Sequence, residues 1–272
     1  MIPNEFSIEG KVAIVTGAGR GIGKAISLVL AEAGADIVVA ARTKDQIEKT
    51  AKEIDDLGQR VLAIPTDVTK ADQVEHLIET TISEFGRIDI LVNNAGASRP
   101  RQLIPLPGIK LPRWQRVDDL NTSISEEEWR LVLDSNLTST FICTKAVGPH
   151  MIQQRKGKVI NISSVAAESG GAYFSSYDTS KAAVSMFTRC IALEWAPFNI
   201  NVNAIGPGFF HTQMTAKEHE TPDLREQMHS SVPLGRAGET REIGLLALYL
   251  ASNASNYLTG QTIFLDGGLL AR

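Results

Sequence analysis

The chain has 272 residues, of which 43% are hydrophobic and 21% charged, a balance that excludes disordered, fibrous and collagen-like proteins. Its formal net charge of −4, with no basic block, makes nucleic acid a poor candidate for a partner. No apolar run approaches the roughly 20 residues of a membrane-spanning helix, and residues 1–10 lack the pattern of an export signal, so we expect a cytoplasmic protein without a membrane partner.

Apolar, strand-like runs alternate with helix-length amphipathic stretches along the chain. Several runs are rich in Val and Ile without alternation, which is typical of strands covered on both faces. The alternation predicts a seven-stranded parallel sheet wrapped by helices. The predicted strands are 11–16, 36–41, 61–66, 88–93, 158–163, 199–205 and 261–265. The predicted helices are 21–33, 43–57, 70–85, 125–153, 176–195 and 239–252.

Two of these helices carry a start signal. The patterns Thr43-x-x-Gln46 and Ser125-x-x-Glu128 are typical of capping boxes. In such a box the first side chain accepts a hydrogen bond from the backbone N–H of the last residue, and the side chain of the last residue accepts one from the backbone N–H of the first. We therefore expect helices to begin directly after Thr43 and Ser125.

Two long connections interrupt the alternation. The stretch 97–124 separates a strand from a helix by far more than the usual few residues, and it carries prolines and basic residues. The stretch 207–235 is rich in Gly, Pro, His and Glu. Open α/β sheets bind ligands at connections that follow the carboxyl ends of strands. We therefore predict that 97–124 is an inserted loop near the substrate entrance and that 207–235 is a substrate lid.

A glycine-rich turn lies between the first predicted strand and the first predicted helix. Glycines let the backbone approach a phosphate closely, and a helix N-terminus offers N–H groups and the positive end of its dipole. This placement favours a dinucleotide site over the alternative, a purely structural turn. The predicted phosphate-binding residues are Gly17, Gly19, Arg20, Gly21, Ile22 and Gly23.

The end of the second predicted strand indicates which dinucleotide binds. An NAD site usually ends this strand with an acid that accepts from the ribose hydroxyls, whereas here Ala41 is followed by Arg42. Arg42 and Arg20 could hold a 2′-phosphate through charge-assisted hydrogen bonds. We therefore predict that NADP(H) is preferred. The alternative is that these arginines are merely solvated, in which case NAD(H) remains possible.

Five polar residues suggest a catalytic group. Tyr177 and Lys181 are four residues apart in a predicted helix and therefore share a face. Ser163 and Ser164 close a predicted strand, and Asn136 lies within the preceding helix. Taken separately these features are weak, since a YxxxK pair is more often a surface Tyr and Lys.

In this order, however, the motifs resemble those of the short-chain dehydrogenase/reductase family over essentially the whole chain. The matching segments are TGAGRGIG at 16–23, DV at 67–68, NNAG at 93–96, Asn136, INISS at 160–164, YDTSK at 177–181, Pro207-Gly208 with Thr212, PLGRAGETREI at 233–243 and LTGQTIFLDGG at 258–268. The resemblance implies a doubly wound (Rossmann) fold with residues 1–272 as one dinucleotide-binding and catalytic domain. It also implies a homotetramer, with a dimer as the alternative, and an oxidoreductase that transfers a hydride between NADP(H) and a ketone or secondary alcohol.

The resemblance further implies catalytic roles. Tyr177 is expected to be the general acid in carbonyl reduction and the base in alcohol oxidation. A free phenol titrates near 10, so work near neutrality asks for a pKa about 3 units lower, with Lys181 and the oxidised nicotinamide as the available cations. Lys181 is also expected to bind the nicotinamide ribose. Ser164 is expected to polarise the substrate oxygen, with Ser163 as the competing choice, and Asn136 to hold a water that connects Lys181 to solvent.

Further cofactor contacts are implied by the same resemblance. Asp67 is expected to accept from the adenine amine, although it could instead cap a helix near Thr69, and Val68 to pack beside the ring. Thr212 could likewise be an ordinary polar loop residue. The remaining residues expected to line the cofactor are Asn93, Ala95, Gly96, Pro207 and Gly208.

The other open questions concern the surroundings of the site. Arg99 and Arg101 in the insertion could receive an acidic substrate, or the insertion could be a solvated flap or a subunit contact. The two cysteines form no CxxC, and the spacing of His211, His219 and His229 matches no metal motif, so we predict no metal site. The predicted helix 125–153 is apolar nearly all round, which favours contact with a second subunit. A catalytically silent dinucleotide-binding regulator remains the alternative function.

Overall fold

Seven parallel strands form one sheet in the order β3-β2-β1-β4-β5-β6-β7. The structure is a computed structural model that describes residues 3–106, 122–212 and 222–271. Every neighbouring pair of strands is parallel. The strands are β1 (Val12–Thr16), β2 (Asp36–Ala41), β3 (Val61–Pro65), β4 (Ile90–Asn93), β5 (Gly157–Ile162), β6 (Ile200–Pro207) and β7 (Thr262–Leu265).

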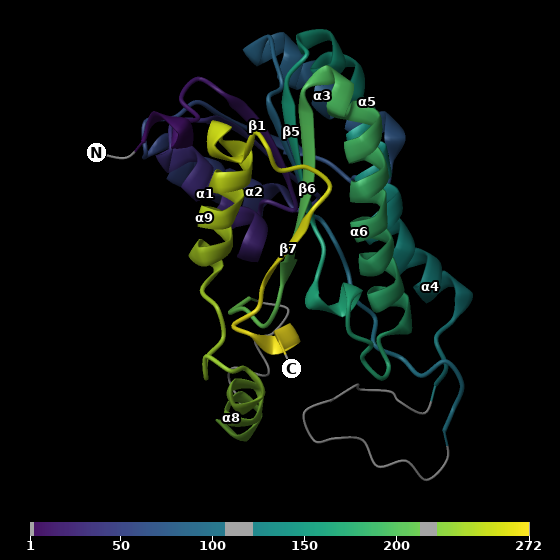
Figure 1. The fold of residues 1–272 in the computed structure, drawn as a ribbon. Coiled ribbons are helices and arrows are strands. Elements are labelled where there is room, and N and C mark those ends of the chain that lie inside the picture. The colour runs from purple at the N-terminus through teal and green to yellow at the C-terminus, as the bar shows by residue number, and fades with distance from the viewer. Residues whose placement is uncertain (1–2, 107–121, 213–221, 272) are drawn as a thin grey trace.

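Helices cover both faces of the sheet (Figure 1). One face is covered by α1 (Gly21–Glu32), α2 (Lys44–Asp55) and α9 (Thr240–Ala251), and the other by α3 (Ala71–Phe85), α5 (Ser139–Gln154) and α6 (Ser175–Trp195). Two further helices are α4 (Glu126–Leu133) and α8 (Pro222–Ser231). None of the described helices is long and apolar enough to cross a bilayer.

The pleat of β1 explains why its sequence is apolar without alternation. Val12 and Ile14 belong to the core under α3, α5 and α6, whereas Ala13 and Val15 belong to the core under α1, α2 and α9. All four side chains are buried. Because successive side chains of a strand point to opposite faces, a strand with helices on both sides must be apolar at every position.

The order of the strands creates a crevice between β1 and β4. From β1 the sheet continues to β2 and β3 in one direction, and from β4 it continues to β5, β6 and β7 in the other. The connections that leave the carboxyl ends of β1 and β4 therefore diverge, and such a point is where open α/β sheets bind ligands. This is the doubly wound Rossmann fold predicted from the sequence.

Three local predictions differ from the structure. The Ser125–Glu128 capping box is present, but Thr43, although it precedes α2, makes no side-chain cap hydrogen bond. The predicted helix 125–153 is divided by a turn of π-helix at Asp134–Thr138. The predicted lid 207–235 contains the helix α8, which its mixed polar sequence did not indicate.

The ends of the inserted loop are paired, although residues 107–121 lie outside the described part of the chain. Gln102 and Ser123 form a parallel bridge, and the Ile124 N–H donates to the Gln102 carbonyl at 2.8 Å. The Gln102 side chain is buried, and its oxygen accepts from the Leu106 N–H at 2.7 Å. The insertion therefore leaves and rejoins the fold at one fixed point.

Candidate active site

The glycine-rich turn connects β1 to α1 and leaves little room for side chains. Gly17 and Gly21 have φ angles of 65° and 56°, in the left-handed region that favours glycine. A Cβ atom on Gly17 would lie 2.8 Å from the side-chain nitrogen of Asn94, whereas one on Gly21 would meet only Thr212, at 3.8 Å. Arg20, which precedes α1, makes no side-chain hydrogen bond that caps the helix. A helix start offers N–H groups and a positive dipole end to an anion, so the turn fits the phosphates of a dinucleotide.

The other predicted members of the turn pack tightly around it. A Cβ atom on Gly19 would lie 2.8 Å from Cβ of Gln46, and one on Gly23 would collide with the Gly17 carbonyl. Ile22 packs against the core under α1, and Arg20 is exposed at the helix start. The packing of the turn therefore requires glycine at positions 19 and 23, whether or not a ligand is bound.

Asn94, within the NNAG segment at 93–96 that was expected to line the cofactor, ties the turn to β4. Its backbone N–H donates to Thr16 Oγ1 at 3.0 Å. Its side-chain amide donates to the carbonyls of Thr16, at 2.9 Å, and Gly17, at 3.2 Å. Its place directly after β4, the neighbour of β1, is the sequence signal that points to this role.

Arg42 and Asp67 lie close together past the ends of β2 and β3. Asp67 Oδ1 accepts from the Thr69 N–H at 3.1 Å and the Thr69 hydroxyl at 2.8 Å, so the local turn considered from sequence is present. Burial acts to raise the pKa of Asp67, but the Thr69 hydrogen bonds and the charges of Arg42 and Lys70 hold it below its ordinary value. Among the described residues none donates to Oδ2, and Val68 is buried beside it. The Asp67 carboxylate is thus ionised, with one oxygen left for a ligand.

Ser164, Tyr177 and Lys181 come together at the carboxyl end of β5. Ser164 follows β5 by two residues, and its hydroxyl lies near the Tyr177 phenol in the first turn of α6, where it lowers the pKa of that phenol. Lys181, one turn further along α6, is buried, and its ammonium donates to the Ile162 carbonyl at 2.7 Å. This ammonium lies 5.7 Å from the centre of the Tyr177 ring.

The electrostatics of this group differ from the sequence expectation. Burial raises the pKa of Tyr177 above its ordinary value, the nearby Ser164 hydroxyl lowers it, and the charge of Asp178 raises it again, leaving the net effect upward. Burial also lowers the pKa of Lys181 to about 8. The depression expected for the phenol is therefore absent in the protein alone, because desolvation opposes the anion and the Lys181 ammonium is directed to a carbonyl.

Ser163 occupies a different environment from its neighbour. Its hydroxyl donates to the Lys181 carbonyl at 3.0 Å and shares a hydrogen bond of 2.8 Å with the Ser185 hydroxyl. The side chain is 2% exposed. The Ser163 hydroxyl thus fastens β5 to α6, and Ser164 is the serine that meets Tyr177.

Asn136 lies in the π-turn between α4 and α5 and joins two parts of the site. Its Oδ1 accepts from the Ala97 N–H at 2.8 Å, and its Nδ2 donates to the Ala97 carbonyl at 2.9 Å and to Ser180 Oγ at 2.8 Å. A Cβ atom on Gly96 would lie 2.7 Å from Asn136 Oδ1 and 3.6 Å from Lys181 Nζ. Both amide hydrogens are therefore engaged, and the second lone pair of Oδ1 is what remains for a water.

Asn93 braces the sheet below this segment. Its amide donates to Asn161 Oδ1 at 2.9 Å and to Thr144 Oγ1 at 3.0 Å, which links β4 to β5 and α5. Its Oδ1 is buried and has no hydrogen-bond partner among the described residues. Ala95 follows half-buried, and its N–H donates to Thr16 Oγ1 at 3.1 Å.

The segment after β6 lies over the first turn of α1. Pro207 ends β6, the Gly208 N–H donates to the Leu265 carbonyl at 3.0 Å, and Thr212 approaches the glycine turn. A Cβ atom on Gly208 would lie 2.8 Å from the Cα of Asp266, so a side chain has no room there. The predicted cofactor residues of this segment thus share one edge of the sheet with the glycine turn.

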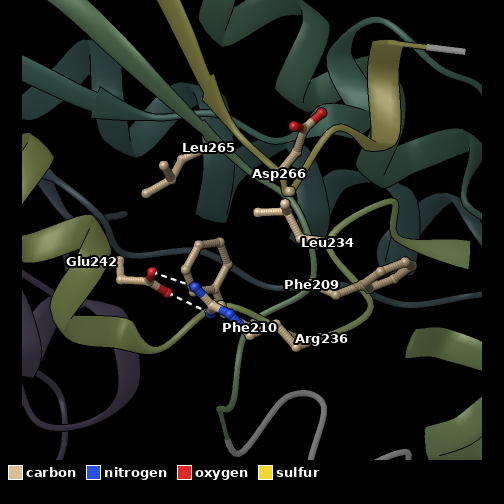
Figure 2. Close-up of a pocket in the computed structure, with 9 residues that line it drawn as sticks. Phe209, Phe210, Leu234, Arg236, Glu242, Leu265 and Asp266 are labelled. Atoms are coloured by element: carbon tan, nitrogen blue, oxygen red, sulfur yellow. Dashed lines mark hydrogen bonds and ion pairs between the residues drawn. The ribbon is translucent and has the colours of Figure 1, made fainter. Parts of the chain in front are cut away.

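Figure 2 shows a small pocket beside this segment, where the Arg236 side chain reaches Glu242 close to the Phe210 ring. The two hydrogen bonds between Arg236 and Glu242 measure 2.9 Å and 2.7 Å, and they lower the pKa of Glu242 to about 2. The pocket has a volume of about 60 Å³, and none of the predicted catalytic residues lines it. We assign it no substrate. Its other lining residues are Phe209, Leu234, Gly238, Leu265, Asp266 and Gly267.

The two arginines at the start of the insertion have different environments. The Arg101 guanidinium lies 3.4 Å from the Glu128 carboxylate, and its backbone N–H donates to the Tyr173 carbonyl at 2.8 Å. Arg99 is exposed and donates to the carbonyl of Ser98. These contacts favour the structural interpretation for Arg101. Within the described ranges no three His, Cys, Asp or Glu side chains gather as metal ligands, and His219 lies outside those ranges.

Comparison with known proteins agrees with this geometry. A family model described as enoyl-(acyl carrier protein) reductase matches residues 17–270. The chain is 40% identical over 263 residues to the 3-oxoacyl-(acyl-carrier-protein) reductase FabG of Thermotoga maritima, covering 97% of this chain and 99% of that protein.

Two solved structures are similar over nearly their whole length. One is a gluconate 5-dehydrogenase from Burkholderia cenocepacia in complex with NADP and tartrate (TM-score 0.87, 33% identity, 99% of this chain and 98% of that one). The other is a short-chain type dehydrogenase/reductase from Mycobacterium marinum (TM-score 0.86, 35% identity, 99% of both chains). With its parallel sheet, glycine turn and Ser–Tyr–Lys group, the chain belongs to the short-chain dehydrogenase/reductase family of oxidoreductases.

Proposed function

We propose that this oxidoreductase transfers a hydride between NADP(H) and a ketone or secondary alcohol at the site formed by Ser164, Tyr177 and Lys181. The observation that carries the proposal is the position of the Ser164 hydroxyl near the Tyr177 phenol, close enough to lower its pKa, with a buried lysine one turn further along the same helix. When bound, the reduced nicotinamide supplies the hydride. The family relationship and the NADP complex of the gluconate 5-dehydrogenase support this cofactor.

The chain's own residues supply the proton chemistry. A carbonyl oxygen placed between Ser164 and Tyr177 accepts two hydrogen bonds, which stabilise the negative charge that develops as the carbonyl is reduced. The raised pKa of Tyr177 keeps the phenol protonated near neutral pH, so it is ready to donate its proton. In the protein without cofactor the phenol is therefore in the protonated form that carbonyl reduction requires.

Lys181 and Asn136 prepare the site without donating to the substrate. The Lys181 ammonium, fixed by the Ile162 carbonyl, is placed to bind the nicotinamide ribose and to stabilise a tyrosinate when one forms. Asn136 holds the Ala97 backbone and Ser180 together, and Ser180 in turn donates to the Tyr177 carbonyl at 2.6 Å. Asn136 thereby positions the start of α6, and a water on its remaining lone pair would supply protons to Lys181.

The substrate class proposed is a ketone that carries an acidic group. The similar proteins are named for an acyl-carrier-protein thioester and for gluconate, both of which combine an oxygenated carbon with a nearby anion or anionic carrier. A screen of NADPH oxidation with 3-oxoacyl thioesters, keto sugar acids, steroids and cyclic ketones tests this class. Turnover confined to the uncharged ketones would contradict it.

Replacing Tyr177 with phenylalanine tests the catalytic assignment. We expect kcat to fall by about 1,000-fold or more, because the proton donor is lost, while NADPH binding, measured by fluorescence, changes little. The matched control is Tyr257→Phe, since Tyr257 is fully exposed. Substantial turnover by Tyr177→Phe would refute the assignment and favour a site that binds the dinucleotide without this chemistry.

We also propose that the protein assembles, as a homotetramer, through the helices on the α5 and α6 side. Leu131 on α4 and Phe141 on α5 are 43% and 45% exposed, and Met186 and Leu193 on α6 are 53% and 80% exposed. Met186 and Leu193 are seven residues apart and share a face of the helix. Large apolar side chains of this kind mark an interaction surface.

A further inference from the structure

The turn that leads into α6 has an unusual backbone. Tyr173 has a φ angle of 74°, in a region that bulky residues rarely adopt. The turn lies between Ser164 and Tyr177, so it borders the site. A backbone of this kind persists only where surrounding contacts hold it, and such residues cluster near functional sites.

Two contacts from outside hold this turn. On one side the Arg101 N–H donates to the Tyr173 carbonyl at 2.8 Å, which ties the turn to the stem of the insertion. On the other side the Gly171 N–H donates to Asp178 Oδ2 at 2.6 Å. Asp178 is therefore the side chain that connects the turn to α6, immediately after Tyr177.

The Asp178 carboxylate carries its charge in a half-buried place. Among the described residues, no lysine, arginine or histidine lies within ion-pair distance of it. Burial raises the pKa of Asp178 and the Gly171 hydrogen bond lowers it, with burial prevailing. Asp178 directly follows the half-buried Tyr177 in the first turn of α6, and its negative charge raises the pKa of the Tyr177 phenol.

The other charged groups near the start of α6 are engaged elsewhere or are exposed. The Lys181 ammonium donates to the Ile162 carbonyl. Arg101 and Glu128, from the insertion stem and α4, pair with each other. Asp134 in the π-turn and Glu168 after the 3-10 turn Val165–Ala167 are exposed, and neither forms a described hydrogen bond or ion pair with Tyr177.

We propose that Asp178 is a positioning residue of this site: its carboxylate anchors the 170–173 turn through Gly171, and its negative charge opposes a second negative charge on the adjacent Tyr177 hydroxyl. This inference rests on the proposed function of Tyr177. Asp178, which lies between Tyr177 and Lys181 in the sequence, thus has two separable effects. One is on the turn that borders the substrate site, and the other is on proton transfer by Tyr177.

Two substitutions separate these effects. Asp178→Asn keeps an oxygen that can accept from Gly171 but removes the charge, whereas Asp178→Ala removes both. For Asp178→Asn we expect the pH profiles of ketone reduction and of alcohol oxidation to move to lower pH by about half a unit or more, with KM near that of the wild type. For Asp178→Ala we expect the same pH shift together with a severalfold higher substrate KM. Glu194→Gln, an exposed acid on the same helix, is the charge-matched control and should leave both unchanged.

Each result decides one part of the proposal. A wild-type pH profile in Asp178→Asn would overturn the charge effect, and equal KM values in the two variants would overturn the anchoring effect. Circular dichroism checks that the variants are folded. The NMR shift of labelled Tyr177, identified by its loss in Tyr177→Phe, gives its titration in the cofactor-free protein. A lower Tyr177 pKa in Asp178→Asn, measured by NMR, supports the charge effect. An active Tyr177→Phe enzyme would refute the proposed function but would leave this NMR result standing.

Discussion

The adjacent hydroxyls of Ser163 and Ser164 have different partners, so alanine at each position separates stability from catalysis. Ser163 makes two buried hydrogen bonds, to the Lys181 carbonyl and the Ser185 hydroxyl. Loss of the Ser163 hydroxyl leaves both partners without that hydrogen bond in the buried interior. A buried hydrogen bond contributes about 0.5–1.5 kcal/mol, so we expect Ser163→Ala to lower the free energy of unfolding by about 2 kcal/mol. Because this hydroxyl does not meet Tyr177, kcat should stay near the wild-type value.

Ser164→Ala should show the opposite pattern. Its hydroxyl accepts from the Ala166 N–H at 3.1 Å, a cap on a short 3-10 turn whose loss costs about 0.5–1 kcal/mol of stability. Its hydroxyl lies near the Tyr177 phenol, and the proposed place of the substrate oxygen is between the two. Removal of one such donor lowers kcat/KM by about 100- to 1,000-fold.

Urea unfolding and NADPH oxidation with one ketone, measured on both variants and the wild type, compare the two effects directly. The kinetics are measured well below the unfolding midpoint of the less stable variant. If Ser163→Ala lost activity as severely as Ser164→Ala, or if Ser164→Ala kept its full kcat/KM, the reasoning from these contacts would be refuted.

Three further predictions follow from the cofactor edge, a buried lysine and the exposed helix face. Arg42→Ala should weaken NADPH binding by about 10-fold or more, because a charge-assisted contact to the 2′-phosphate is lost, and should leave NADH binding unchanged. Lys44→Ala is the control. Equal effects of Arg42→Ala on the binding of the two cofactors would contradict the assignment. Lys158 is 6% exposed and burial lowers its pKa from 10.5 to about 8, so its deprotonation should add up to about 3 kcal/mol of stability as pH rises from 8 to 10.5. Urea unfolding of Lys158→Met should lack this gain, and parallel pH curves for the two proteins would disprove it. Leu193→Asp should shift the mass found by light scattering toward that of a monomer, and a wild-type protein that is itself monomeric would rule out the proposed assembly.

Most of the fold follows from local patterns. The Val- and Ile-rich runs predict buried parallel strands, and each of the seven observed strands coincides with a predicted one to within about two residues. The π-turn at Asp134–Thr138 and the missing cap at Thr43 were not predictable, because both depend on packing with other elements. The same holds for α8, whose polar sequence has little helical periodicity.

The candidate site was predictable in membership and less so in its contacts. Residues that come from β1, β4, β5 and α6 were expected to meet, and Ser164, Tyr177 and Lys181 do meet at one edge of the sheet. The bracing role of Asn94 and the anchoring contact of Asp178 depend on neighbours 78 and 7 residues away along the chain, respectively. Their partners are therefore fixed by the fold and not by adjacent sequence.

The amino-acid sequence by itself determined the strands, the glycine turn and the order of the motifs, because these depend on hydrophobic period and on backbone freedom at glycine. Only the tertiary structure decided that the Ser163 hydroxyl is engaged by Lys181 and Ser185, and that Arg101 is paired with Glu128. It also decided that the pKa of Tyr177 is raised in the protein without its cofactor. That direction depends on how much water and which charges surround the phenol, and these are properties of the packed molecule and not of any one segment.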